Sequence, residues 1–263
     1  MILPGSAWLT AALLFTLPGA PRQGSNDGWG LMQDDANQTT IASVAYSTGN
    51  TIAVICRAGQ IDVLLTGMPE TAEPTRIVGL QYDSRPTDHQ SWLTATTPTS
   101  MISGLPGPNV RRLRVSQRLA VTLSLSPDER PRRYVLDLPT DPSGLDQVMI
   151  ACNQPLTNPR DDLPVWDMLN FVSPRNGWAR MPRPEFPQAA ASAGIPAGYA
   201  ILSCVVGPGG IPQDCQTEKE SDPRGGFGVS ALEAMTSARI RMSGEGRAQI
   251  GQLFRGTIRF QIR

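Results

Sequence analysis

The sequence is short of lysine and histidine and carries no net charge. Lys219 is its only lysine, His89 is its only histidine, and 23 basic residues balance 23 acidic ones. A chain without excess positive charge has no electrostatic reason to bind nucleic acid. Zinc sites need clustered Cys and His ligands, and the sequence has neither a CxxC pair nor a second histidine. We therefore expect no nucleic-acid partner, no metal and no other cofactor.

The sequence also lacks an apolar run long enough to cross a membrane. Its N-terminal apolar stretch runs from about Ala7 to Leu17, short of the ~20 residues that span a bilayer. Such a stretch is typical of a secretory signal, and Gly19 and Ala20 are small residues of the kind found at cleavage points. We expect residues 1–22 to be a signal peptide, or a weak N-terminal anchor, and the protein to lie in the periplasm.

An even number of cysteines in an exported protein predicts disulfides. In the stretch ILSCVVGPGGIPQDCQTE, two strand-like runs flank a Pro-Gly-Gly turn, which predicts a hairpin with Cys204 and Cys215 on neighbouring strands. Facing residues of an antiparallel pair lie about 4.5 Å apart between Cα atoms, within reach of a disulfide. Two reduced thiols are the alternative. We also predict a disulfide between Cys56, on a strand, and Cys152, at the end of a short helix.

Residues 27–153 are predicted to form a mainly β, sandwich-like domain. The run RLAVTLSLSP alternates apolar and polar residues with the period of a half-buried strand. A proline-rich segment follows, which we interpret as a linker. The expected units are a β domain at 27–153, a linker at 154–183 and a second domain at 184–263.

The last third of the chain has a different pattern. A short helix is expected after Pro187, then the cysteine hairpin, then an amphipathic helix starting at Phe227. The final run LFRGTIRFQIR alternates like a strand with one apolar and one polar face. This order predicts a small αββαβ domain, and hence an α+β fold class for the whole chain. The polar face of the last strand holds Arg255, Thr257, Arg259, Gln261 and Arg263.

The order of these motifs resembles the C-terminal domain of the TonB family of energy transducers, over residues 182–263. The matching positions are Phe186, Pro187, Gly198, Val206, Gly210, Ile211, Phe227, Ala231 and the run RGTIRF. The resemblance implies an αββαβ fold in the periplasm that binds outer-membrane transporters, whose short peptide adds a strand to the sheet edge. Residues 27–153 weakly resemble exported β-sandwich domains of the invasion-associated locus B type, in Trp29 and the run IAVICRAG.

The sequence gives little sign of an enzyme. A Ser-His-Asp triad would need His89, which we expect in a loop, and no GxSxG elbow is present. The carboxylates at 161–162 and 218–220 lie in polar connectors, where we interpret them as solvated. We expect a protein that binds protein partners through the polar face of its last strand, in TonB-dependent transport. Coupling to an inner-membrane motor is doubtful, because the N-terminal apolar stretch is short and no proline-rich rod follows it.

The alternative is an accessory or structural envelope protein that uses its C-terminal domain only as a stable module. The arginines of the last strand then serve to prevent aggregation, since charges on an edge strand discourage indiscriminate pairing.

Overall fold

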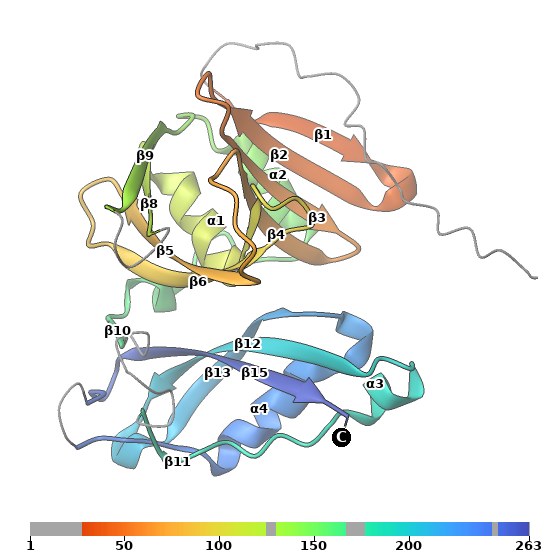
Figure 1. Cartoon of the computed structure of the whole chain (residues 1–263), viewed down its shortest axis with the longest axis vertical. Helices are drawn as coiled ribbons and strands as arrows, with labels where there is room; N and C mark the ends of the chain where they lie inside the picture. The colour runs from red at the N-terminus through yellow and green to blue at the C-terminus, as the bar shows by residue number, and fades with distance from the viewer. Residues whose placement is uncertain (1–27, 125–129, 167–176, 244–246, 263) are drawn as a thin grey trace, which may run out of the picture.

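The computed structural model describes residues 28–124, 130–166, 177–243 and 247–262. The predicted signal segment, residues 1–22, lies outside these ranges. Figure 1 shows two bodies stacked one above the other, the first from the N-terminal part of the chain and the second from the C-terminal third. Strand makes up 43% of the structure and helix 23%, so the protein is mostly β.

A nine-stranded sheet, antiparallel throughout, forms the first body, in the order β1-β2-β3-β4-β7-β6-β5-β8-β9. The short strand β7 joins the two halves, and buried residues from both halves share one core. The arrangement is therefore β-sandwich-like. The strands are β1 Gly30–Asp34, β2 Thr39–Ala45, β3 Thr51–Arg57, β4 Gln60–Thr66, β5 Thr75–Tyr82, β6 Asp88–Thr94, β7 Met101–Ser103, β8 Arg118–Leu123 and β9 Arg132–Asp137.

Two helices pack on this sheet, α1 (Pro106–Val115) and α2 (Ser143–Ala151). α1 begins on a proline, whose missing N–H would have no partner in the first turn of a helix anyway. α2 lies on β2 and β3. Cys152 follows α2 directly and is bonded to Cys56 on β3, which confirms the predicted disulfide between these two residues. The bond fixes the end of this body to a strand near its start.

The second body is built around a four-stranded sheet in the order β10-β15-β12-β13. α4 packs on β12 and β13, and a two-stranded sheet pairs β11 with β14. The elements are β10 Val165–Trp166, β11 Trp178–Arg180, α3 Gln188–Ser192, β12 Ala197–Val206, β13 Pro212–Glu220, α4 Phe227–Ser237, β14 Arg239–Ile240 and β15 Leu253–Gln261. Single-turn 3₁₀ helices complete the structure at η1 Asp35–Asn37, η2 Pro159–Asp162, η5 Pro208–Gly210 and η6 Pro223–Gly225.

The predicted α+β class, with a small self-contained αββαβ domain, is wrong. The large antiparallel sheet dominates a mostly β structure, and the C-terminal sheet takes β10 from the segment predicted as linker. β10 runs parallel to β15, and the Leu253 N–H donates to the Pro164 carbonyl at 2.8 Å. The prolines suggested a linker, but edge strands tolerate proline. The Trp166 ring, 6.1 Å from that of Phe254, anchors this strand in the core.

The second predicted disulfide, Cys204–Cys215, is also present. It joins β12 to β13 where their register shifts between Ser203 and Val205. Two disulfides indicate an oxidising environment outside the cytoplasm. Within the described ranges, no helix combines the length and the apolarity needed to cross a bilayer.

Candidate functional site

The outer edge of β15 is the feature that most resembles a binding site. Beyond Phe254, no strand in the described part of the chain pairs with this edge. The Leu253 N–H points outward, toward the β10 side. On the opposite side, the Gln252 carbonyl accepts a hydrogen bond from β12, and the Ile262 N–H donates to the residue that precedes β12. Backbone direction alternates along a strand, so the N–H and C=O groups of Arg255, Thr257, Arg259 and Gln261 point away from β12. These are the groups that an added strand would use.

The predicted binding residues do not all lie in the same environment. The side chains of Thr257, Arg259 and Gln261 are exposed. Arg255, by contrast, turns toward the first body, where its Nη1 donates to both carboxylate oxygens of Asp88 at 2.8 Å. Its side chain is only 17% exposed. Arg263 lies outside the described residues, so three exposed residues of the predicted set remain along the open edge.

Asp88 connects the edge to a buried polar network in the first body. Its Oδ2 also accepts a hydrogen bond from Gln90 Nε2, and Gln90 exchanges two hydrogen bonds with Asn109. The Tyr82 hydroxyl donates to Asn109 Oδ1. Burial, reinforced by the Asp88 charge, raises the pKa of the Tyr82 phenol well above its ordinary value. The ion pair therefore ties β15 to groups that are held rigidly by their own partners.

The first body contacts part of the face of the C-terminal sheet opposite α4. On this face, Lys219 of β13 pairs with Asp62 of β4, in addition to the Arg255–Asp88 pair. The Ile201 side chain on β12 lies against Gly104, where an added Cβ would come within 2.9 Å of its Cδ1. The alternation of the last strand is therefore correct, but part of its polar face contacts protein rather than water.

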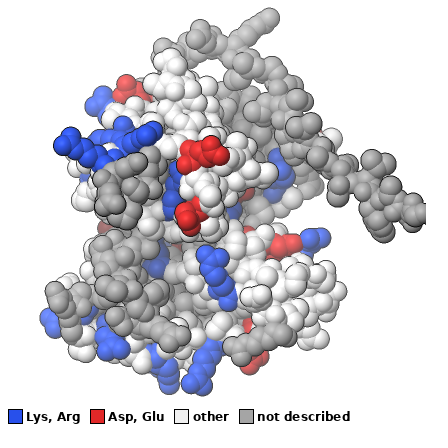
Figure 2. All heavy atoms as spheres, in the orientation of Figure 1, with Lys and Arg blue, Asp and Glu red and all other residues white. Residues whose placement is uncertain are grey.

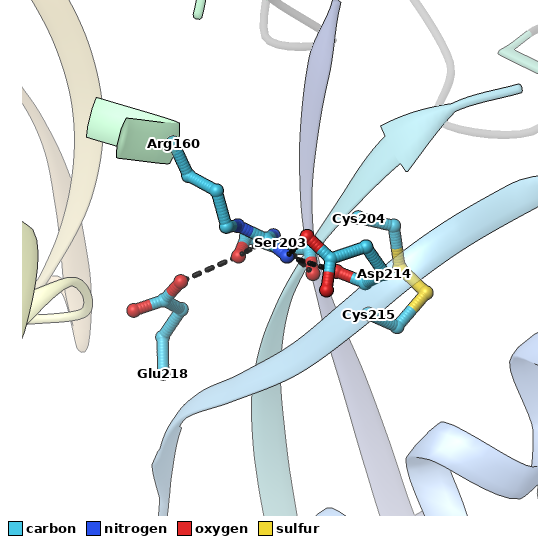
Figure 3. The surroundings of a disulfide bond; sticks show 6 residues. All are labelled: Arg160, Ser203, Cys204, Asp214, Cys215 and Glu218. Carbon is cyan, nitrogen blue, oxygen red and sulfur yellow. Dashed lines mark hydrogen bonds and ion pairs between the residues drawn. A yellow bond between two sulfur atoms is a disulfide. The ribbon is translucent and has the colours of Figure 1, made fainter. Parts of the chain in front are cut away.

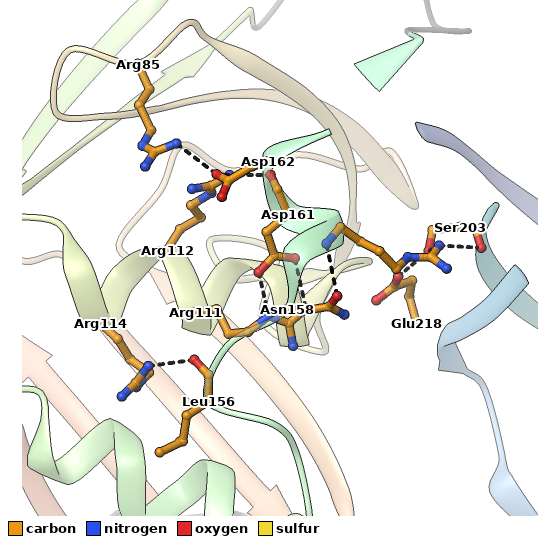
Figure 4. A network of polar contacts seen from close by, with 11 residues as sticks. Arg85, Arg111, Arg112, Arg114, Leu156, Asn158, Asp161, Asp162, Ser203 and Glu218 are labelled. Atoms are coloured by element: carbon orange, nitrogen blue, oxygen red, sulfur yellow. Dashed lines mark hydrogen bonds and ion pairs between the residues drawn. The ribbon is translucent and has the colours of Figure 1, made fainter. Parts of the chain in front are cut away.

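The 3₁₀ helix η2 links the two bodies (Figure 4). On one side, Asp161 accepts two hydrogen bonds from Arg111 of α1, at 2.5 and 3.0 Å, and Asp162 pairs with Arg112 at 3.0 Å. Arg112 and Arg85 hold the pKa of Asp162 below its ordinary value, mainly through the hydrogen bond from Arg112. The interpretation of Asp161 as a solvated charge is therefore wrong, since its side chain is only 12% exposed, whereas Asp162 is 72% exposed and remains in contact with solvent.

On its other side, η2 sends Arg160 into the C-terminal sheet beside the Cys204–Cys215 disulfide (Figure 3). Arg160 Nη2 donates to the hydroxyl of Ser203 at 2.7 Å, and that hydroxyl donates to Glu218 at 2.5 Å. Arg160 also pairs with Asp214 at 2.7 Å. Ser203, at the centre of the cluster, is 1% exposed, whereas the Asp214 side chain is 61% exposed. These contacts clamp η2 to the C-terminal sheet.

A cavity of about 130 Å³ opens between the bodies at the start of the free edge of β15. Its apolar wall comes from Leu105, Val165, Trp166 and Ile201, and Thr257 lies on the β15 side. The exposed side chains of His89 and Ser91 also line it. His89 therefore lies on strand β6. The prediction that it lies in a loop, which rested on its polar surroundings, is wrong.

On the face shown in Figure 2, the basic side chains of the second body are spaced apart by uncharged surface. A larger hollow of about 640 Å³ lies in the first body, around Arg118 and Asp137, which pair with each other at 3.0 Å. Within the described ranges, no three His, Cys, Asp or Glu side chains are grouped so as to hold a metal ion.

The contact between Arg255 and Asp88 gives a measurable coupling between the two bodies. We expect Arg255→Ala and Asp88→Ala each to lower the free energy of unfolding. The double variant should lose about 1–2 kcal/mol less than the sum, because the bifurcated, charge-assisted hydrogen bond is lost only once. Urea unfolding of the four proteins checks this. Additive losses would mean that the pair does not couple the bodies; Arg259→Ala, at an exposed position, is the control and should change little.

The sequence contained no signal for the cavity or for the clamp of η2, because each joins residues that are more than 40 positions apart. The alternation of β15 did identify the edge. Comparison of the chain with protein-family models finds no match, and comparison with curated proteins finds none either.

Proposed function

We propose that this protein binds an extended segment of another envelope protein as an additional strand on the outer edge of β15. The observation that carries the proposal is the row of outward backbone groups from Arg255 to Gln261, with no strand against it in the described ranges. Main-chain hydrogen bonds supply most of the affinity in such complexes, and pockets for alternate side chains supply specificity. The two disulfides support an extracytoplasmic setting.

The sequence resemblance of residues 182–263 to the TonB family supplies the partner class. It favours outer-membrane transporters as the source of the added strand and TonB-dependent transport as the process, with the periplasm as the compartment. The proposed role is binding and not catalysis. In the described residues, the cluster of Arg160, Ser203 and Glu218 has its serine at a buried position.

A second candidate function is that of an accessory envelope protein in which the C-terminal sheet is only a stable module. The observation in its favour is the use of Arg255 in an internal ion pair, which leaves fewer charges free for a partner. The two functions differ in one respect. Strand addition needs the outward N–H groups of β15, and a structural module does not.

The test uses the full chain and a change of a single N–H group. Thr257→Pro removes an outward N–H and places a ring on the edge, while the bonds to β12 come from the alternate residues. Thr257→Ala removes the same side chain but keeps the N–H, and is the matched control. The ligands are labelled synthetic peptides from the N-terminal segments of outer-membrane transporters, and fluorescence anisotropy measures binding.

We expect the proline variant to bind such peptides at least about tenfold more weakly than the wild type, since a hydrogen bond is lost and the strand is displaced. The alanine variant should bind within about twofold of the wild type, a difference well under 1 kcal/mol. Both variants should unfold at nearly the same urea concentration. Equal binding by the proline variant, or no binding of any peptide, would contradict the proposal and favour the structural role.

A further inference from the structure

We propose that the cavity beside β15 is a side-chain subsite for the bound segment, which takes an aliphatic side chain with an acidic residue two positions away. The inference rests on the proposed strand addition and specifies the chemistry of the partner. Its starting point is that the cavity lies next to the end of β10, where an added strand would begin. Trp166, the last residue of β10, is part of its wall.

The register of the sheet determines which side chain reaches the cavity. Ile201 on β12 is the partner of Thr257 on β15, and both residues line the cavity. Paired residues of adjacent strands project to the same face, with Cβ atoms about 4.5–5.5 Å apart. A residue added opposite Thr257 therefore continues this row and points into the space between the two bodies.

The size and lining of the cavity favour an aliphatic side chain. Its volume of about 130 Å³ is close to that of engineered apolar cavities, of about 150 Å³, that stay dry and bind benzene. Leu105, Val165 and Ile201 offer methyl groups, and the Trp166 ring offers a flat apolar surface. His89 and Ser91, which are exposed, add polar groups to the lining, so the cavity is in contact with water on their side. A leucine, isoleucine or valine side chain fits this environment.

The charge of Arg259 favours an acidic residue in the bound segment, two positions from the aliphatic one. The next row on the same face pairs Tyr199 with Arg259, and Arg259 is exposed. Among the described residues no carboxylate forms an ion pair with Arg259, whereas Arg255 is neutralised by Asp88. Residues two apart on a strand share a face, so the partner residue beside Arg259 is two positions from the aliphatic one. An aspartate or glutamate there would pair with the free guanidinium.

The test uses short synthetic peptides with a neutral host of alternating threonine and glutamine. One peptide carries leucine with aspartate two residues after it, and a second carries the reverse order, since the direction of the added strand decides which one fits. In the controls, leucine is replaced by alanine or aspartate by asparagine. We expect one order to bind the full chain at least about tenfold more tightly than its alanine control, which is the effect of burying an aliphatic side chain.

Two variants test the two halves of the subsite separately. Ser91→Phe fills the mouth of the cavity and should abolish the preference for leucine over alanine without changing the preference for aspartate. Arg259→Glu should reverse the charge preference, so that a lysine peptide binds more tightly than the aspartate peptide. The reversal is a gain of binding that a misfolded variant could not produce.

The outcomes separate this inference from the proposed function. Binding that is weakened by Thr257→Pro but shows no preference for leucine or aspartate would overturn the subsite and leave strand addition standing. A preference that persists in Ser91→Phe, or that is not reversed in Arg259→Glu, would also overturn it. Loss of all binding to the wild-type chain would overturn both.

Discussion

Removal of the Cys56–Cys152 disulfide is expected to lower the free energy of unfolding by about 4–5 kcal/mol. The bond joins residues separated by 96 positions, and a crosslink over a long loop restricts the unfolded chain most. Cys204–Cys215 spans 11 positions, and its loss is expected to cost only about 2–3 kcal/mol by the same loop-entropy relation. Each pair is replaced by alanine in a double variant, so that no free thiol remains.

Urea unfolding under non-oxidising conditions provides the measurement, with the wild-type protein and both double variants compared side by side. The slope of free energy against urea should rise most in the variant that lacks Cys56–Cys152, because its unfolded state is the least compact. Reduction of the wild-type protein with dithiothreitol should add the two losses. An equal cost for the two bonds, or a reversed order, would show that the loop argument does not govern the stability of this protein.

The Cys204–Cys215 disulfide could be predicted from the sequence because its signal is local: the two cysteines flank a turn. The Cys56–Cys152 disulfide spans 96 positions and had no such local signal; its prediction rested on placing Cys152 at the end of a short helix and Cys56 on a strand. The last strand, like the Cys204–Cys215 disulfide, was predictable, since its alternation is complete within Leu253–Gln261. Local patterns of this kind depend only on the chain near them.

The arrangement of the two bodies could not be predicted in this way. Alternation distinguishes the two faces of β15, but it does not say whether the polar face meets water or the carboxylate of Asp88. The pattern of β6 likewise does not reveal what surrounds Gln90. Gln90 is a polar residue at a buried position, and it is accommodated because Asn109, 19 positions away, satisfies its amide group. Nothing in the sequence around Gln90 identifies Asn109 as its partner.

The family resemblance has a physical explanation that is independent of binding. Several of its matching positions form one packed cluster in the second body. The Phe227 ring lies edge-on to that of Phe186, with centroids 6.1 Å apart, and 5.3 Å from that of Phe260. Gly198 adjoins the same ring. These positions therefore reflect the packing of α4 against the sheet, whereas the proposed binding edge uses the backbone groups of the alternate residues of β15.

Phe227 is the centre of this cluster, and its truncation to alanine is expected to cost about 3–5 kcal/mol, as for other fully buried aromatic side chains. The reason for a glycine at 198 follows from the same ring. A Cβ at that position would lie 2.2 Å from Phe227 Cε2 and 2.3 Å from Cζ, far inside van der Waals contact. Gly198→Ala should therefore destabilise the protein by about 1–3 kcal/mol through overpacking.

The two positions should be strongly coupled. Phe227→Leu removes the ring atoms that the new methyl group would meet, so Gly198→Ala should cost much less in that background than in the wild type, by about 1–2 kcal/mol. Gly28→Ala is the control, since its added Cβ would meet only Asp141 Oδ2 at 3.8 Å, and it should be nearly neutral. Urea unfolding of the four proteins of the cycle gives the coupling directly. Strict additivity would show that the ring moves aside without cost, and that glycine at 198 is not required by the packing of Phe227.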